Sequence, residues 1–294
     1  MKRLWRILKR TVTEFFEDDA MRLSAALAYY SVFSLAPLLL ICVAVAGAVF
    51  GEDAVRGQLD DQLTSAVGEQ GAHAVREMLA NAHRPAAGIW ASIIGGTVLL
   101  FGAGGVFGQL QDALNVVWGV KAKKGLRLWD LARDRFLSFT MVLGAGFLLL
   151  ISMVLSVAFH VANRWVERIA KLPPEVWSTM TGVAGFLLVA LLFAAIFKIL
   201  PDVEVKWRHV WMGALLTALL FSIGQSLISW YLGREAIASS YGTAGSLALV
   251  LLWVHYSAII LLFGAEFTQV WAVEHGEEIR PVRNAERKTR TDGQ

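Results

Sequence analysis

Six long apolar runs constrain the fold of this chain more than any other feature of its sequence. An α-helix needs roughly 20 apolar residues to cross the hydrocarbon core of a bilayer. Backbone groups in lipid must be paired within the segment, so long apolar runs predict helices, and no strand-like alternation competes with them here. The predicted membrane spans are residues 24–50, 89–110, 136–162, 176–200, 210–232 and 246–271.

Composition agrees with a lipid-facing surface. The 294 residues are 56% hydrophobic and 17% charged, whereas soluble domains carry about a quarter charged residues. The single cysteine, Cys42, lies inside an apolar run, so a disulfide framework or a thiolate metal cluster cannot be built from this chain alone. We therefore expect an all-α, polytopic membrane helix bundle with about six transmembrane helices.

The distribution of basic residues predicts the orientation of the bundle. When the loops are assigned alternately to the two sides, most of the 27 Lys and Arg residues fall on the side that also holds both termini. Positive charge favours the cytoplasmic side. The first outside loop, residues 51–88, carries more acidic than basic residues, which agrees with this assignment. We expect a multi-pass inner-membrane protein with both termini in the cytoplasm.

The segments outside the spans differ in character. In residues 1–23, apolar side chains recur at helical spacing between basic ones, which predicts an amphipathic helix at the cytoplasmic headgroup region; they are Leu4, Leu8, Val12, Phe15 and Phe16. Within the transmembrane domain, residues 24–271, the extracytoplasmic loop 51–88 shows helical periodicity and is expected to form a helical pair. The polar, charge-mixed tail, residues 272–294, is expected to be disordered.

Several segments together resemble the YihY/BrkB family of bacterial inner-membrane proteins. They are RLSAALAYYSVFSLAP at 22–37, FGQLQDALNVVWG at 107–119, Leu200-Pro-Asp202 followed by Trp207-Arg208, YGTAGS at 241–246 and Gly264-Ala-Glu266. They keep the family's order from about residue 11 to 275. The resemblance implies a six-helix membrane fold, with transport as a proposed activity. Members have also carried the label ribonuclease BN and a virulence name.

The sequence does not predict an enzyme, a metal site or a cofactor site. A metal-dependent nuclease needs clustered His, Asp or Glu, but the six histidines are scattered, and His73 with Glu77 supplies only two ligands. The glycines between 102 and 108 follow no strand, and no Walker-type motif occurs, so an ATP site is not expected. We predict no catalytic residue, no metal, no cofactor and no nucleic-acid partner.

Polar groups inside the spans are the candidate functional residues, because their burial in lipid is costly. Glu266 is the clearest, and His255 precedes it by three helical turns on nearly the same face. The predicted transport pathway comprises Glu266, His255, Gln225, Ser222, Ser229, Tyr30 and Ser34. The alternatives stay open: Glu266 pairs with a basic residue at the membrane boundary, His255 makes a structural hydrogen bond, and the small polar residues are interhelical contacts.

A second polar group is expected at the cytoplasmic ends of the spans. Acids followed by basic residues predict a cytoplasmic gate, with a structural latch as the alternative; the residues are Asp112, Asn115, Asp202 and Arg208. The inner basic loops are also suited to anionic lipid headgroups.

These features favour a transporter or translocator of a lipid, a lipid-linked anion or a small ion, without its own ATP site. The alternative is a membrane scaffold that binds an envelope partner through the outer helical loop. A membrane enzyme or ribonuclease ranks last, for want of a nucleophile with an adjacent base. Self-association as a homo-oligomer stays open, since glycine-lined helix faces permit close approach.

Overall fold

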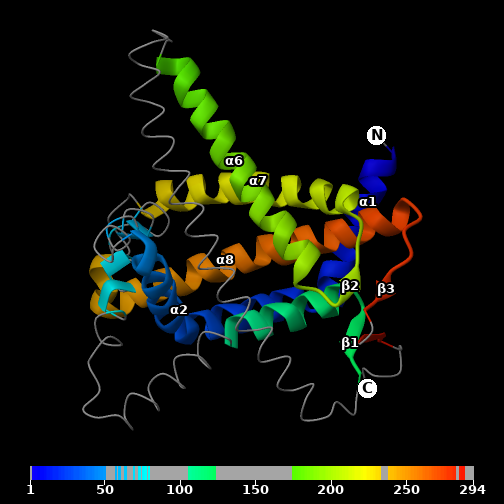
Figure 1. Ribbon diagram of the computed structural model, residues 1–294, viewed down its shortest axis with the longest axis horizontal. Coiled ribbons are helices and arrows are strands. Elements are labelled where there is room, and N and C mark those ends of the chain that lie inside the picture. The colour runs from blue at the N-terminus through cyan, green and yellow to red at the C-terminus, as the bar shows by residue number, and fades with distance from the viewer. Residues whose placement is uncertain are drawn as a thin grey trace.

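A computed structural model describes residues 2–50, 57, 59–60, 63–64, 69, 72–73, 75–77, 79, 105–123, 174–232, 238–282 and 285–288. Over these residues the protein is an all-α membrane helix bundle with two short sheets at one end (Figure 1). Among them, three segments are long and apolar enough to cross a bilayer: Gly182–Ile199, Trp207–Leu227 and Val250–Glu274. They coincide with the last three predicted spans.

The other predicted spans are only partly covered. The first lies within helix α2 (Ala20–Phe50), which runs as one helix through the whole predicted range. The third, residues 136–162, lies outside the described residues, as does most of the second, 89–110. The described end of the second continues as helix to residue 117, because polar Gln111, Asp112 and Asn115 find partners or solvent at the bundle end.

The last three helices form a consecutive packed series. Helix α6 (Pro174–Ile199) packs on α7 (Trp207–Leu232), and α7 packs on α8 (Ala238–Glu274). The other side of α8 contacts α2, which lies beside it in Figure 1. At 37 residues, α8 is about 55 Å long, well beyond the ~30 Å hydrocarbon core. Its ends therefore reach past the hydrocarbon on at least one side.

Helix α1 (Lys2–Glu17) precedes α2 and packs along the C-terminal half of α8. Ile7, Thr11 and Phe15 are buried, whereas Leu8, Val12 and other apolar residues of α1 are exposed. Of the predicted apolar stripe, only Phe15 is therefore buried in the protein. The exposed apolar side chains suit a helix at the membrane surface, which remains a prediction.

Two antiparallel strand pairs tie the C-terminal segment to the bundle end. Strand β1 (Val120–Ala122) pairs with β4 (Ala285–Arg287), and β2 (Val203–Glu204) pairs with β3 (Arg280–Pro281). This differs from the disordered tail expected for 272–294. The sequence composition missed it because the strands use backbone hydrogen bonds to distant segments rather than apolar burial of their own. In the described tail, Gly276 (φ 76°) makes the turn that ends α8.

The described residues of the outer loop are helical in both predicted stretches. Leu59, Leu63 and Leu79 pack against a small cluster of Leu39, Val75 and Val250. The Arg76 guanidinium bonds Asp60, and also Glu69 at 2.9 Å. These contacts join the two stretches to each other and to helices α2 and α8.

Candidate functional site

Glu266 is the one acidic side chain that the described residues bury completely. It lies in the candidate span Val250–Glu274, eight residues or about 12 Å before the end of α8, with a relative exposure of 0%. Neither carboxylate oxygen has a hydrogen-bond partner among the described residues. A buried carboxyl without a hydrogen-bond donor is costly, which makes Glu266 the leading candidate for a functional residue.

The helix that carries Glu266 is fixed against α7 by two reciprocal contacts. A Cβ atom added at Gly213 would collide with the Thr268 side chain, and one added at Gly264 would collide with Thr217. Both threonine hydroxyls donate to the carbonyl four residues earlier, Thr217 to Gly213 and Thr268 to Gly264, at 2.7 Å. The pairing is that of two antiparallel helices in close approach. These contacts leave α8, and Glu266 with it, little freedom to slide along α7.

Helix α1 is positioned over the same part of α8 from the other side. The Phe15 and Phe263 rings meet edge to face, with centroids 5.9 Å apart, and Ile7 packs with Phe267 and Val270. At the far end, Arg3 donates to the Glu274 carbonyl at 2.7 Å, and the Arg10 guanidinium lies 3.7 Å from the Glu274 carboxylate. Helix α1 therefore runs antiparallel to α8, with its C-terminal end near Glu266.

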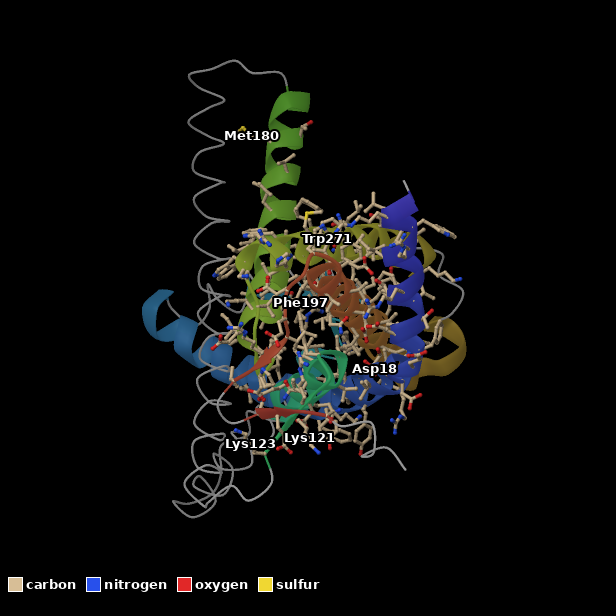
Figure 2. The ribbon with its side chains drawn as sticks, turned by 90° about the vertical axis from the view of Figure 1, so that its right-hand side faces the viewer. Asp18, Lys121, Lys123, Met180, Phe197 and Trp271 are labelled. Atoms are coloured by element: carbon tan, nitrogen blue, oxygen red, sulfur yellow. The ribbon has the colours of Figure 1, made fainter. Side chains whose placement is uncertain are left out.

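This register brings Asp18 to Glu266. Asp18 follows α1 directly, and its N–H donates to the Glu14 carbonyl at 2.9 Å, which extends the helical turn by one residue. The two carboxyls are close enough to interact. Figure 2 shows Asp18 where α1 joins the bundle, far from Met180 on the outlying part of α6.

Asp18 titrates far above an ordinary aspartate. Burial raises the pKa of Asp18 from 3.8 to about 6; the interaction with Glu266 and the charge of Lys288 oppose this rise, while Glu14 and Glu17 add to it. Asp18 itself is only partly buried. Asp18 is therefore a partly exposed acid next to the fully buried Glu266, and its pKa of about 6 is close to neutral pH.

The other predicted pathway residues whose side chains the structure describes do not gather at Glu266. Gly224 packs face to face with Tyr256, so their neighbours Gln225 and His255 lie at one level of the α7–α8 pair, with His255 about 16 Å along the helix from Glu266. His255 Nδ1 is buried and has no partner within the described part of the chain. Ser222 donates to the Ala218 carbonyl of its own helix at 2.9 Å.

On α2, Ser34 is 2% exposed and Tyr30 43% exposed, and both lie against Gly105. Their contact is thus with the helical residues 105–117 rather than with Glu266. The side chain of Ser229 lies outside the described residues.

The predicted gate residues are partly brought together around Asp202. The Asn115 amide donates to Asp202 Oδ2 at 2.8 Å and its carbonyl accepts from the Asp202 N–H at 2.9 Å. Gln111 donates to Asp202 Oδ1 at 3.2 Å, and the Asp202 carbonyl accepts from Val282 N–H at 3.0 Å. Partial burial and the nearby Asp202 carboxylate raise the pKa of Asp112. This arrangement has the form of a latch.

Arg208 is not part of that arrangement. Its Nε lies 3.0 Å from His209 Nε2, and the same ring nitrogen lies 2.9 Å from the Glu277 carboxylate, which also pairs with Lys206 at 3.1 Å. Arg208 was expected beside Asp202 from their closeness in sequence, but strand β2 and the start of α7 separate the two side chains. Asp202 takes its bonds from amides instead.

Comparison with known proteins identifies the family of this chain. The model of the family described as virulence factor BrkB matches residues 11–289, nearly the whole sequence. The chain belongs to the BrkB family. The matched range includes Asn115, Asp202 and Glu266. No solved structure matches.

Relatives of this BrkB-family chain are named only as membrane proteins. It is 28% identical over 270 residues to the UPF0761 membrane protein of Verminephrobacter eiseniae, covering 90% of this chain and 62% of the relative. The UPF0761 membrane protein of Saccharophagus degradans is 27% identical over 270 residues (92% and 60%). Mannheimia succiniciproducens UPF0761 membrane protein MS0032 is 23% identical over 265 residues (87% and 86%). The chain thus spans about three fifths of the first two relatives.

Sequence reasoning missed Asp18. The signal available was the acidic run Glu17-Asp18-Asp19 directly before the first span, at a position where the bundle end needs a polar residue. Only the register of α1 on α8 shows which of these acids meets Glu266. Within the described residues, no group of three or more His, Cys, Asp and Glu is placed to hold a metal ion.

Proposed function

We propose that this BrkB-family membrane protein is a transporter or translocator, and that Glu266 binds the small cation whose gradient drives it. The observation that carries the proposal is the complete burial of the Glu266 carboxyl, without a hydrogen-bond partner among the described residues, inside a candidate span. Ionisable residues inside spans typically belong to ion or proton pathways. If this position only had to pack the helices together, an apolar side chain would do so without the cost of burying a carboxyl.

The cargo we propose is an amphipathic anion such as a lipid or lipid-linked anion. Helix α1 supports this choice, because exposed apolar residues such as Trp5 and Phe16 lie beside a basic face on the side predicted to be cytoplasmic. The basic residues of that face are Lys2, Arg3, Arg6, Lys9 and Arg10. Such a helix attracts anionic headgroups. We place the protein in the bacterial inner membrane with both termini inside.

The test is flux by the purified full chain in liposomes. Proton or sodium flux and movement of a fluorescent anionic lipid are measured in parallel, for the wild type, Glu266→Gln and Gln225→Ala. The matched control is Glu278→Gln, because Glu278 is an exposed acid just beyond α8, with 69% of its side chain accessible. We expect Glu266→Gln to lower flux by about tenfold or more and the control to leave it unchanged.

A membrane scaffold is the second candidate. It is favoured by the Arg76 ion pairs with Asp60 and Glu69, which fasten the outer helical stretches into one surface for an envelope partner. In that case Glu266→Gln would leave function intact, and wild-type flux would not exceed that of empty liposomes. Replacing Arg76 by Ala would then weaken partner binding.

A further inference from the structure

Two acidic side chains from distant parts of the sequence meet at one place in the bundle. Asp18 lies in the two-residue turn between α1 and α2, and Glu266 lies in the last helix, 248 positions later. Like-charged carboxylates in a buried setting cannot both ionise cheaply, so such a pair commonly holds one proton between its two members. Glu266 contributes to this pair a fully buried carboxyl that accepts no hydrogen bond from an N–H or O–H donor of the described residues.

The two acids differ in their access to water. Glu266 is completely buried, whereas Asp18 is partly exposed. Asp18 is therefore the member of the pair that has direct access to water. The charged groups that face Asp18 are Glu14 and Glu17 on α1, Lys288 after β4, and Glu266 on α8.

The turn that carries Asp18 is held in a defined conformation. Asp19 adopts a left-handed conformation, φ 53°, and its carbonyl accepts from the N–H groups of Arg22 and Leu23 at 2.9 and 3.1 Å. These bonds start α2 immediately after the turn. The Asp19 carboxylate pairs outward with Arg22 at 3.0 Å, where both side chains are exposed. Of the two adjacent aspartates, one is directed to solvent and the other to Glu266.

We infer that Asp18 and Glu266 share one exchangeable proton, and that Asp18 is the residue through which Glu266 exchanges it with water on the α1 side. In the exchange, the Glu266 O–H bond breaks as an Asp18 carboxylate oxygen takes the proton, so the negative charge passes to Glu266. Asp18 then gives the proton to water. No oxidant, reductant or other reactant is needed.

This inference rests on the proposed function, because it identifies the coupling ion as the proton. Its geometric basis does not depend on transport: the packing of α1 on α8 brings Asp18 to the fully buried Glu266 carboxyl. The pKa of Asp18 near 6 places its two protonation states within easy reach of each other at neutral pH. An acid that relays protons needs this property.

The test has one arm that does not depend on flux. N,N′-dicyclohexylcarbodiimide reacts with protonated carboxyl groups in apolar surroundings, and peptide mass spectrometry measures how much Glu266 it modifies between pH 5 and 9 in the full-length protein. We expect Asp18→Asn to shift the midpoint of Glu266 labelling by about one pH unit, the size of effect that a neighbouring carboxylate exerts. The matched control is Asp19→Asn, which changes the adjacent, outward-facing acid and should leave the midpoint in place.

The second arm is proton flux in liposomes. Asp18→Asn should slow it about tenfold or more, and Asp18→Glu should restore most of it because a carboxyl is again present. Thermal unfolding of each variant shows that it is folded.

Identical behaviour of Asp18→Asn and Asp19→Asn in both arms would overturn the inference, as would flux that requires Na⁺ and ignores a pH gradient. A labelling shift with no flux in any variant would support the shared proton and reject the proposed transport. Loss of flux in Glu266→Gln alone would support transport and reject the role of Asp18.

Discussion

Two acidic residues at the same end of the bundle, Asp202 and Glu266, differ in how their carboxylates are hydrogen-bonded. Asp202 has an amide donor on each carboxylate oxygen, from Gln111 and Asn115, and its backbone N–H and carbonyl are bonded as well. Glu266 is more deeply buried and has no such donor among the described residues. A satisfied acid joins segments, whereas an unsatisfied one is kept at a cost to stability. The difference supports a structural role for Asp202 and the transport role that we propose for Glu266.

The largest expected effect on stability comes from Asn115→Ala. The change removes two hydrogen bonds and leaves the Asp202 N–H and Oδ2 without their partner. We expect the free energy of unfolding to fall by about 2–3 kcal/mol, measured by thermal or denaturant unfolding in detergent. Gln111→Ala removes a single, longer bond and should cost less. If both variants were as stable as the wild type, Asp202 would not be a latch.

We expect Glu266→Gln to change the free energy of unfolding in the opposite direction. Replacing an unpartnered buried carboxyl by a neutral amide of equal shape removes part of its desolvation cost. We expect unfolding in the same detergent to require about 1 kcal/mol more free energy, or to be unchanged. A loss of stability as large as that of Asn115→Ala would mean that Glu266 has a structural partner after all.

The pH dependence of stability tests whether Asp18, the neighbour of Glu266, is buried in the folded protein. The pKa of Asp18 is about 6 in the folded protein and 3.8 in an ordinary aspartate, so between these values the folded state binds more protons than the unfolded state. The contribution of Asp18 to stability is therefore present below about pH 4 and is lost as the pH rises to about 6. Melting temperatures of the wild type and Asp18→Asn, taken from pH 4 to 8, should diverge in this range in favour of the variant. Curves that stay parallel would show that Asp18 is not buried.

Much of this arrangement was predictable from local sequence, because lipid imposes a simple rule on length and polarity. The last three spans and the costly acid Glu266 came from that rule, whereas the grouping of Asn115 with Asp202 came from acids and basic residues expected together at the cytoplasmic ends of the spans. Residues that depend on packing between distant segments were not predictable. Asp18 lies in a polar turn, and the reciprocal Gly213–Thr268 and Gly264–Thr217 contacts need the register of two helices.

Dependence on distant segments also explains why the strands of the tail and the partner of Arg208 were not predicted. Strands β3 and β4 are two and three residues long and have no pattern of their own, so only their partners define them. Arg208 was grouped with Asp202 by opposite charge and closeness along the chain, but its side chain hydrogen-bonds His209 instead. Charge complementarity in sequence did not tell which of several acids a basic side chain would meet.

The smallest expected effect concerns the turn that positions Asp18. Asp19→Gly removes an exposed ion pair with Arg22 but places at φ 53° the residue that adopts this conformation most readily. The two effects should nearly cancel, to within about 0.5 kcal/mol. Asp19→Val should cost about 1–2 kcal/mol, because a left-handed conformation strains a β-branched residue. Equal stability of the two variants would contradict the turn as described.

The central claim is that Glu266 serves transport and Asp202 serves the fold. The most direct measurement compares Glu266→Gln with Asp202→Asn in the same proteoliposome flux assay, together with their melting temperatures. The account predicts that Glu266→Gln melts normally without flux, while Asp202→Asn melts lower and retains flux per folded molecule. The reverse pattern, or flux that neither substitution alters, would contradict it.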